Sequence, residues 1–243
     1  MVYGNKLNFL WTLGFYLIAS QSSPSVPSIE DKSFIRDCVE AHNEMRRTVH
    51  PSAANMKYMS WDKGLAMTAK AWANKCQKQP NTCTEKPYLC HPTFKYVGEN
   101  IWLDGSYQFK PESAIGLWNN EKMNYNYSIF YCSEVCDHYT QVVWADSYKV
   151  GCAMRTCPLP EGASTAIFVC DYGPLGNNVG ERPYKEGYPC SSCGKKDTCE
   201  KSLCKNEERE KLIEYSNWNP QGKASQWTAC NILYIVCILL RMF

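Results

Sequence analysis

The chain lacks several features that mark common classes of enzyme and nucleic-acid-binding protein. Its net charge is only +2, from 26 basic and 24 acidic residues, and no basic stripe alternates with aromatic residues. No nucleic-acid partner is therefore expected. The sequence contains no Gly-x-Ser-x-Gly elbow, the motif of α/β-hydrolases, and no His-Glu-x-x-His helix, the motif of zinc metalloproteases. We predict no catalytic residue and no enzyme activity.

No apolar run has the length of a comfortable membrane-spanning helix. The run over residues 9–19 follows Lys6 and precedes small residues, which is the order that a signal peptidase reads. We therefore predict that residues 1–22 are a removed signal peptide. An uncleaved membrane anchor is the alternative.

A second short apolar run, residues 232–240, is followed by only three residues and by no basic tail. Small and polar residues precede it, which is the pattern of a glycosylphosphatidylinositol attachment signal. We predict attachment at Gly222 and removal of residues 227–243. A short amphipathic end on a simply secreted protein is the alternative.

Cysteine is abundant, with fifteen residues at irregular spacings. The spacings Cys190-x-x-Cys193 and Cys199-x4-Cys204 could be read as zinc knuckles. The export signal favours disulfides instead, because exported chains reach an oxidising compartment. Residues 182–205 hold four cysteines and almost no aliphatic side chains, so this segment depends on disulfides for its fold. The polar residues 206–226 are predicted to be a tether.

Helical patterns come first along the chain and strand patterns come last. The two strands are separated by a turn-rich linker and predict a hairpin. This order indicates a three-layer α+β domain. The expected helices begin at Ser28, after Asp62 and near Pro111, with a short fourth over residues 138–144, and the strands cover residues 150–154 and 166–170.

Four sequence blocks resemble the CAP superfamily of cysteine-rich secretory, antigen 5 and pathogenesis-related 1 proteins. They are residues 42–46, 98–102, 137–147 and 167–178. One departure is Asp171, where the family usually has Asn or Gln. The order and spacing fit over residues 34–177, and other segments resemble the glioma pathogenesis-related branch. The resemblance implies an α–β–α sandwich, here followed by a small disulfide-rich hinge over residues 182–205.

The resemblance also implies disulfide pairs, which spacing alone does not define. The implied pairs are Cys76–Cys157, Cys152–Cys170, Cys190–Cys199 and Cys193–Cys204. Two further pairs, Cys132–Cys136 and Cys83–Cys90, are suggested by closeness in the sequence. Cys38 is then the odd cysteine.

The family cleft usually holds two His and two acidic residues that can bind a divalent metal. Glu99, Glu121 and His138 match three of these positions, but Pro80 stands where the second His is expected. Because proline offers no ligand atom, we expect a degraded site that holds no cofactor, or at most a weakly bound divalent cation. His91 is the nearest substitute, and His42 is interpreted as a structural side chain.

Asn126 begins an Asn-Tyr-Ser sequon, which predicts a glycan on an exposed loop. Together with the resemblance, the signals imply a non-enzymatic recognition or adhesion glycoprotein on the extracellular face of the cell membrane. Relatives point to the sperm surface or acrosome, and to a partner protein on the egg membrane. The alternatives are a sterol- or lipid-binding secreted protein and a metal-dependent cleft hydrolase.

Overall fold

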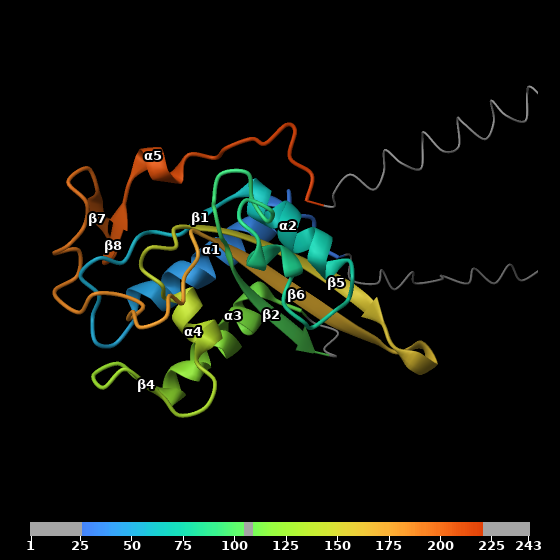
Figure 1. Cartoon of the computed structure of the whole chain (residues 1–243), viewed down its shortest axis with the longest axis horizontal. Coiled ribbons are helices and arrows are strands. Elements are labelled where there is room, and N and C mark those ends of the chain that lie inside the picture. Colours follow the sequence, from blue (N-terminus) through green and yellow to red (C-terminus); the bar gives the residue numbers. More distant parts are fainter. Residues whose placement is uncertain (1–25, 105–108, 221–243) are drawn as a thin grey trace, which may run out of the picture.

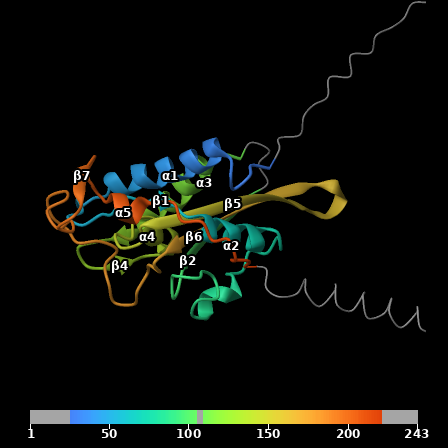
Figure 2. The ribbon, with the colours of Figure 1, turned by 90° about the horizontal axis from the view of Figure 1, so that it is seen from above.

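Figure 1 shows the computed structural model, which describes residues 26–104 and 109–220. A four-stranded sheet forms the middle layer. Helix α2 (Lys63–Ala73) covers one face of the sheet, and helices α1 (Lys32–Arg47), α3 (Pro111–Asn120) and α4 (Asp137–Val142) cover the other. Figure 2 shows these layers from above. The expected three-layer α–β–α sandwich is therefore confirmed.

The sheet has the strand order β1-β5-β6-β2. Strands β5 (Lys149–Pro158) and β6 (Ser164–Gly173) form the long central hairpin, which extends both strands beyond the predicted ranges. Strand β2 (Gly98–Asp104) pairs antiparallel with β6, and the two-residue β1 (Ser60–Trp61) pairs parallel with β5. Nearly every residue of β6 is buried, because helices cover both faces of the sheet.

The helices begin close to the capping residues that the sequence offers. Asp31 is the N-cap of α1 and accepts the backbone N–H of Ser33 at 2.8 Å, so the expected start at Ser28 was wrong. Asp62 caps α2 as expected, by accepting the N–H of Leu65 at 3.0 Å. Pro111 is the first residue of α3, where its missing N–H costs nothing.

The first family block braces α1 against the rest of the domain. The Asn43 amide donates to the Met59 carbonyl and accepts the Met59 N–H, both at 2.8 Å. The fully buried Arg46 guanidinium donates to five backbone carbonyls from two loops, those of Lys57, Val142, Trp144, Ala145 and Ser147. These bonds satisfy loop carbonyls that would otherwise be buried without partners.

Within the described residues six disulfides form, and they are the six pairs given by the family resemblance and by closeness in the sequence. Among the described cysteines, Cys38 is the free one, and it is buried in α1. Burial raises the pKa of its thiol well above the ordinary value, which keeps it protonated and unreactive.

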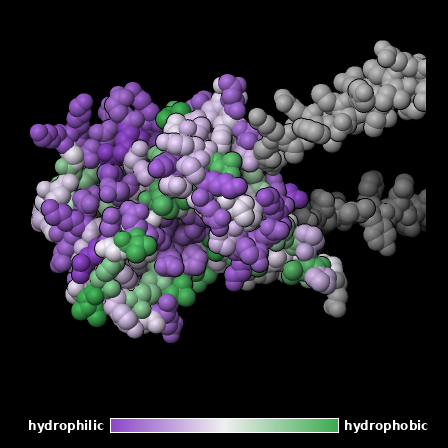
Figure 3. All heavy atoms as spheres, in the orientation of Figure 1, coloured by the Kyte–Doolittle hydropathy of each residue, from purple (hydrophilic) through white to green (hydrophobic). Residues whose placement is uncertain are grey.

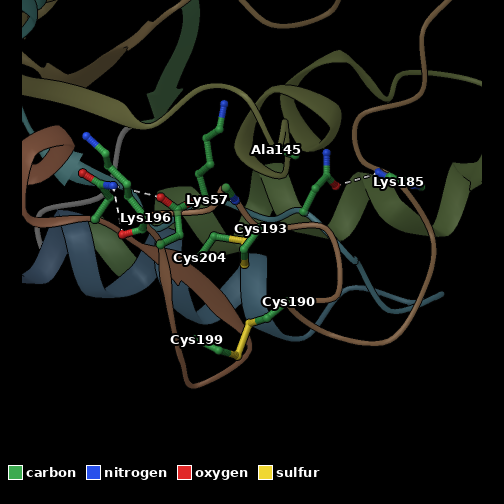
Figure 4. The surroundings of a disulfide bond; sticks show 12 residues. Lys57, Ala145, Lys185, Cys190, Cys193, Lys196, Cys199 and Cys204 are labelled. Carbon is green, nitrogen blue, oxygen red and sulfur yellow. Dashed lines mark hydrogen bonds between the residues drawn. A yellow bond between two sulfur atoms is a disulfide. The ribbon is translucent and has the colours of Figure 1, made fainter.

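The hinge packs against the sandwich and is not a separate body. Its disulfide Cys193–Cys204 lies beside Lys57, and Cys190–Cys199 lies farther out on the hinge (Figure 4). Cys204 exchanges backbone hydrogen bonds with the segment before β1, donating to Met56 at 2.7 Å and accepting from Tyr58 at 3.0 Å. The remaining short elements are η1 (Thr82–Glu85), η2 (Glu121–Asn124), β3 (Tyr125–Asn126), β4 (Tyr131–Cys132), η3 (Pro160–Gly162), β7 (Thr198–Glu200), β8 (Leu203–Lys205) and α5 (Glu207–Glu210).

The predicted signal peptide, the attachment residue Gly222 and the tail over residues 227–243 lie outside the described residues. Within the described ranges, no helix combines the length and apolar character that crossing a bilayer requires. Residues 211–220, expected to be part of a tether, run back along α2 (Figure 1).

Candidate functional site

A cleft of about 540 Å³ opens between the sheet edge at β2 and the elements that flank it. The loop after α2 forms one wall, and α3 with the start of α4 forms the other. Both walls contribute polar and apolar side chains. The lining comprises Lys78, Pro80, Thr84, Val97, Gly98, Glu99, Ile101, Trp102, Leu103, Leu117, Trp118, Glu121, His138, Gln141, Leu175 and Asn177.

Glu121 and His138 form a hydrogen-bonded pair on the helical wall. Glu121 Oε1 lies 2.6 Å from His138 Nδ1. Its other oxygen, Oε2, accepts the backbone N–H groups of His138 at 3.1 Å and Tyr139 at 3.2 Å. The imidazole also stacks parallel to the Trp118 indole, at 6.2 Å between ring centroids. Both carboxylate oxygens of Glu121 are therefore engaged in holding the start of α4.

Glu99 lies on the opposite wall, on the edge strand β2. Its Oε1 accepts the backbone N–H of Asn81 at 2.8 Å, whereas its buried Oε2 has no hydrogen-bond partner among the described residues. Burial raises the pKa of Glu99 to about 7, and the Asn81 N–H opposes this shift.

Asp171 is the cross-strand neighbour of Glu99 on β6 and is fully buried. Neither of its carboxyl oxygens has a hydrogen-bond partner within the described chain. Burial, followed by the charge of Glu99, raises the pKa of Asp171 well above its ordinary value. The departure noted in the sequence thus places a second carboxyl beside the cleft residue Glu99.

The expected metal ligands line one cleft but do not make a complete zinc set. Pro80 also lines the cleft, where it offers no donor atom. In residues 26–104 and 109–220, the single group of three His, Cys, Asp or Glu donor atoms within 4.8 Å of one another is Cys190, Cys193 and Cys204, whose sulfurs are in disulfides. Since zinc takes three or four protein ligands at one point, the residues present do not fit this ion.

The other two candidate histidines serve structural roles outside the cleft. His91 is fully buried, and its Nε2 lies 3.1 Å from Asp62 Oδ1 while its Nδ1 accepts backbone N–H groups from Thr93 and Phe94. It therefore cannot replace the missing imidazole. His42 bonds the Cys38 carbonyl within α1, as its interpretation as a structural side chain requires.

Gln141 is a cleft residue that the sequence analysis missed. Its Oε1 accepts the N–H of Gly176 at 3.2 Å and its Nε2 donates to Ser147 Oγ at 3.1 Å. A Cβ added at Gly98 would lie 2.0 Å from that same Oε1, so the floor of the cleft requires glycine there. Gln141 lies three residues after His138, one helical turn along α4, and this spacing could have predicted that both side chains face the cleft.

The cleft offers little for nucleophilic catalysis. Among the described lining residues, Thr84 has the one hydroxyl group, and it donates to the Asn81 carbonyl at 2.7 Å. The two side chains that could exchange protons across the helical wall, Glu121 and His138, are tied to each other and to the backbone. These bonds brace the helical wall of the cleft.

The sequence model of the cysteine-rich secretory protein (CAP) family matches residues 39–172, and the chain belongs to this family. GLIPR1-like protein 1 of Bos taurus is 50% identical over 243 residues, and that of Homo sapiens is 51% identical over 245 residues, with all of each chain covered. A crystal structure of NaASP2 with Zn²⁺ has a TM-score of 0.59 and 27% identity, and covers 74% of this chain and 100% of that chain. The family prediction, including the branch, is thus confirmed, and the disulfide-rich fold fits an extracellular protein.

Proposed function

We propose that this chain is a non-enzymatic recognition glycoprotein, held on the outer face of the cell membrane by a lipid anchor, that binds a protein on another cell. We further propose that it acts on sperm with a partner on the egg membrane, as the resemblance to the glioma pathogenesis-related branch implies. The observation that carries the proposal is the bracing of the cleft, in which the His138–Glu121 pair is committed to structural hydrogen bonds and Glu99 accepts the Asn81 N–H through one oxygen.

The surface that best fits a protein partner is the hairpin surface, which we define as the β3–β4 turn with the neighbouring residues Val135 and Val179. Apolar side chains gather here in the open, as Figure 3 shows over the lower left of the molecule. Large exposed patches of this kind mark interaction sites. The exposed fractions are 69% for Ile129, 41% for Phe130, 57% for Tyr131, 52% for Val135 and 103% for Val179.

The predicted glycan would be attached within the same hairpin, where Asn126 pairs with Tyr131. Asn126 is exposed on β3, and its Oδ1 accepts the N–H of Ile129 at 3.3 Å. Arg182 donates to the carbonyls of Tyr127 and Ser128 and lies over the Phe130 ring at 5.4 Å, which holds the turn in one shape. A preorganised loop lowers the entropic cost of binding.

The test is binding of the full chain, shown on cells, to egg membranes. We expect Ile129→Glu with Val179→Glu to weaken binding about tenfold or more, because charge placed in an apolar contact must be desolvated. Leu159→Glu is the matched control, since Leu159 is also exposed but lies in the β5–β6 turn. Equal loss in the control, stoichiometric bound sterol, or hydrolysis that chelators abolish would each overturn the proposal.

A further inference from the structure

The C-terminal strap, residues 211–220, returns along the domain and is not the free tether expected from its composition. Lys149 donates its Nζ to the Lys211 carbonyl at 2.9 Å, and Lys63 bridges Glu214 at 3.1 Å and Glu30 at 3.2 Å. The strap therefore begins with a hydrogen bond from the sheet and continues with an ion pair at the start of α2.

The centre of the strap is seated on the capping residue of α2. Tyr215 donates its hydroxyl to Asp62 Oδ2 at 2.8 Å, and its ring packs edge-on against His91 at 4.9 Å. A Cβ at Gly64 would lie 3.0 Å from the Tyr215 ring and 2.6 Å from His91, so glycine in the first turn of α2 is what admits both rings. Trp218 packs beyond them, 6.4 Å from His91.

The strap ends on the outer surface of α2. Pro220 lines a groove of about 320 Å³ with Thr68, Ala71, Trp72 and Lys75. Only Gln221 separates it from Gly222, the proposed attachment residue. Two fully extended residues span about 7 Å, so an anchor attached at Gly222 would begin within about 7 Å of Pro220, and its glycan core would lead from there to the lipid.

Two basic side chains, Lys75 and Arg155, lie at or near the groove where the strap ends. Lys75 lies over the Trp72 ring at 4.3 Å, and Arg155 donates to Asn74 at 3.4 Å. Both are exposed at the C-terminal end of α2, to which the Cys76–Cys157 disulfide ties strand β5. Cationic side chains near a bilayer are attracted to headgroup phosphates.

We infer that the strap is a rigid spacer that seats the C-terminal end of α2 on the phospholipid surface and points the hairpin surface away from the membrane. In Figure 1, the strap ends beside α2 above the middle of the molecule, whereas β4 lies at the lower left and β7 and β8 at the far left. The inference rests on the lipid anchor of the proposed function. A bilayer is the occupant that the short remaining chain and the basic rim both favour.

The experiment uses the full chain on cells and measures its release by phosphatidylinositol-specific phospholipase C. A seated domain shields the anchor, so we expect slow release of the wild type. Tyr215→Ala with Trp218→Ala should speed release at least fivefold, and so should ten Gly/Ser residues inserted after Pro220 in the otherwise natural chain. Tyr188→Ala, an exposed aromatic of the hinge, is the matched control and should change nothing.

Two further measurements separate the parts of the inference. Lys75→Glu with Arg155→Glu should speed release about twofold at low salt, whereas Lys110→Glu, exposed at the start of α3, should not. Cleavage of the folded chain after Glu214 by a glutamyl endopeptidase should be at least tenfold faster in the Tyr215/Trp218 variant than in the wild type.

Equal cleavage after Glu214 in the wild type and the Tyr215/Trp218 variant would overturn the inference that the strap is packed on the domain. Equal release of the wild type and the linker-insertion variant would overturn the membrane-facing surface. Absence of release from every variant would overturn the lipid anchor, and with it the membrane-facing surface, while the cleavage result would still decide the seat of the strap.

Discussion

His42 gives the protein a dependence on pH that can be worked out from its hydrogen bonds. Its Nδ1–H donates to the Cys38 carbonyl at 2.7 Å, and its Nε2 accepts the Tyr172 hydroxyl at 2.9 Å. That hydroxyl accepts in turn from the Asn100 amide at 3.2 Å. A proton added at Nε2 would face the Tyr172 hydrogen, and the fully buried ring exposes no surface to bulk solvent that could hydrate the added charge.

Burial therefore lowers the pKa of His42 from 6.5 to about 4, with the Arg46 charge adding to the shift and the Cys38 carbonyl opposing it. Because the pKa is lowered in the folded state, stability is complete above the ordinary pKa and is lost as the pH falls from 6.5 toward 4. Each pKa unit is worth about 1.4 kcal/mol, so about 2–3 kcal/mol of unfolding free energy should be lost between pH 7 and about pH 4.5.

The variant His42→Gln isolates this contribution. At pH 7 it should be about 1–2 kcal/mol less stable than the wild type, since buried hydrogen bonds are lost. At about pH 4.5 the deficit should vanish or reverse, because glutamine has no proton to take up. Guanidinium unfolding followed by tryptophan fluorescence measures both, with the exposed His50→Gln as control. A deficit that stays constant within about 0.5 kcal/mol at the two pH values would refute the reasoning.

Three other outcomes are expected. Arg46→Met should destabilise the domain by about 4 kcal/mol in the same unfolding assay, because it leaves five carbonyls without their donor; a loss under about 1 kcal/mol would contradict the bracing role. Calorimetry should show weak zinc binding by the wild type, weaker binding by His138→Ala and tighter binding by Pro80→His, since the imidazole supplies the missing donor; tight wild-type binding unaffected by His138→Ala would place the site elsewhere. Asn126→Gln should lower the intact mass of the exported protein by one glycan, and an unchanged glycan mass would show that the sequon is unused.

Local signals in the sequence predicted the elements whose cause is itself local. The cap at Asp62, the helix start at Pro111 and the hairpin of β5 and β6 depend on neighbours in the chain, and all three are present. The sequence analysis assigns residues 98–102 to a family block and predicts no strand there. The alternation in β2 of Glu99, Ile101 and Leu103 with Asn100 and Trp102 is consistent with a strand, but short and half-buried patterns of this kind are weak.

Contacts between residues that are far apart in the sequence could not be predicted from local patterns. Asp62 receives His91 from 29 residues along the chain and Tyr215 from 153 residues along it. Composition made residues 211–220 look like a polar tether, although their two aromatic residues carry the packing. The sequence also did not predict the unpaired carboxyl oxygens of Asp171. Only the register of β2 on β6 brings Glu99 beside Asp171.

The hydrogen bonds that shape the cleft also occupy carboxylate oxygens that a metal would need as ligands. Glu121 uses one oxygen for His138 Nδ1 and the other for two backbone N–H groups at the start of α4. Recruiting it to a metal would break that cap, and Pro80 supplies no donor in return. Glu99, from the facing wall, already binds the Asn81 N–H through one oxygen. A cation that recruited Glu121 would therefore displace bonds that hold the helical wall, whereas Glu99 Oε2 has no hydrogen bond to lose. The proposed recognition function therefore rests on the exposed hairpin surface and not on a metal in the cleft.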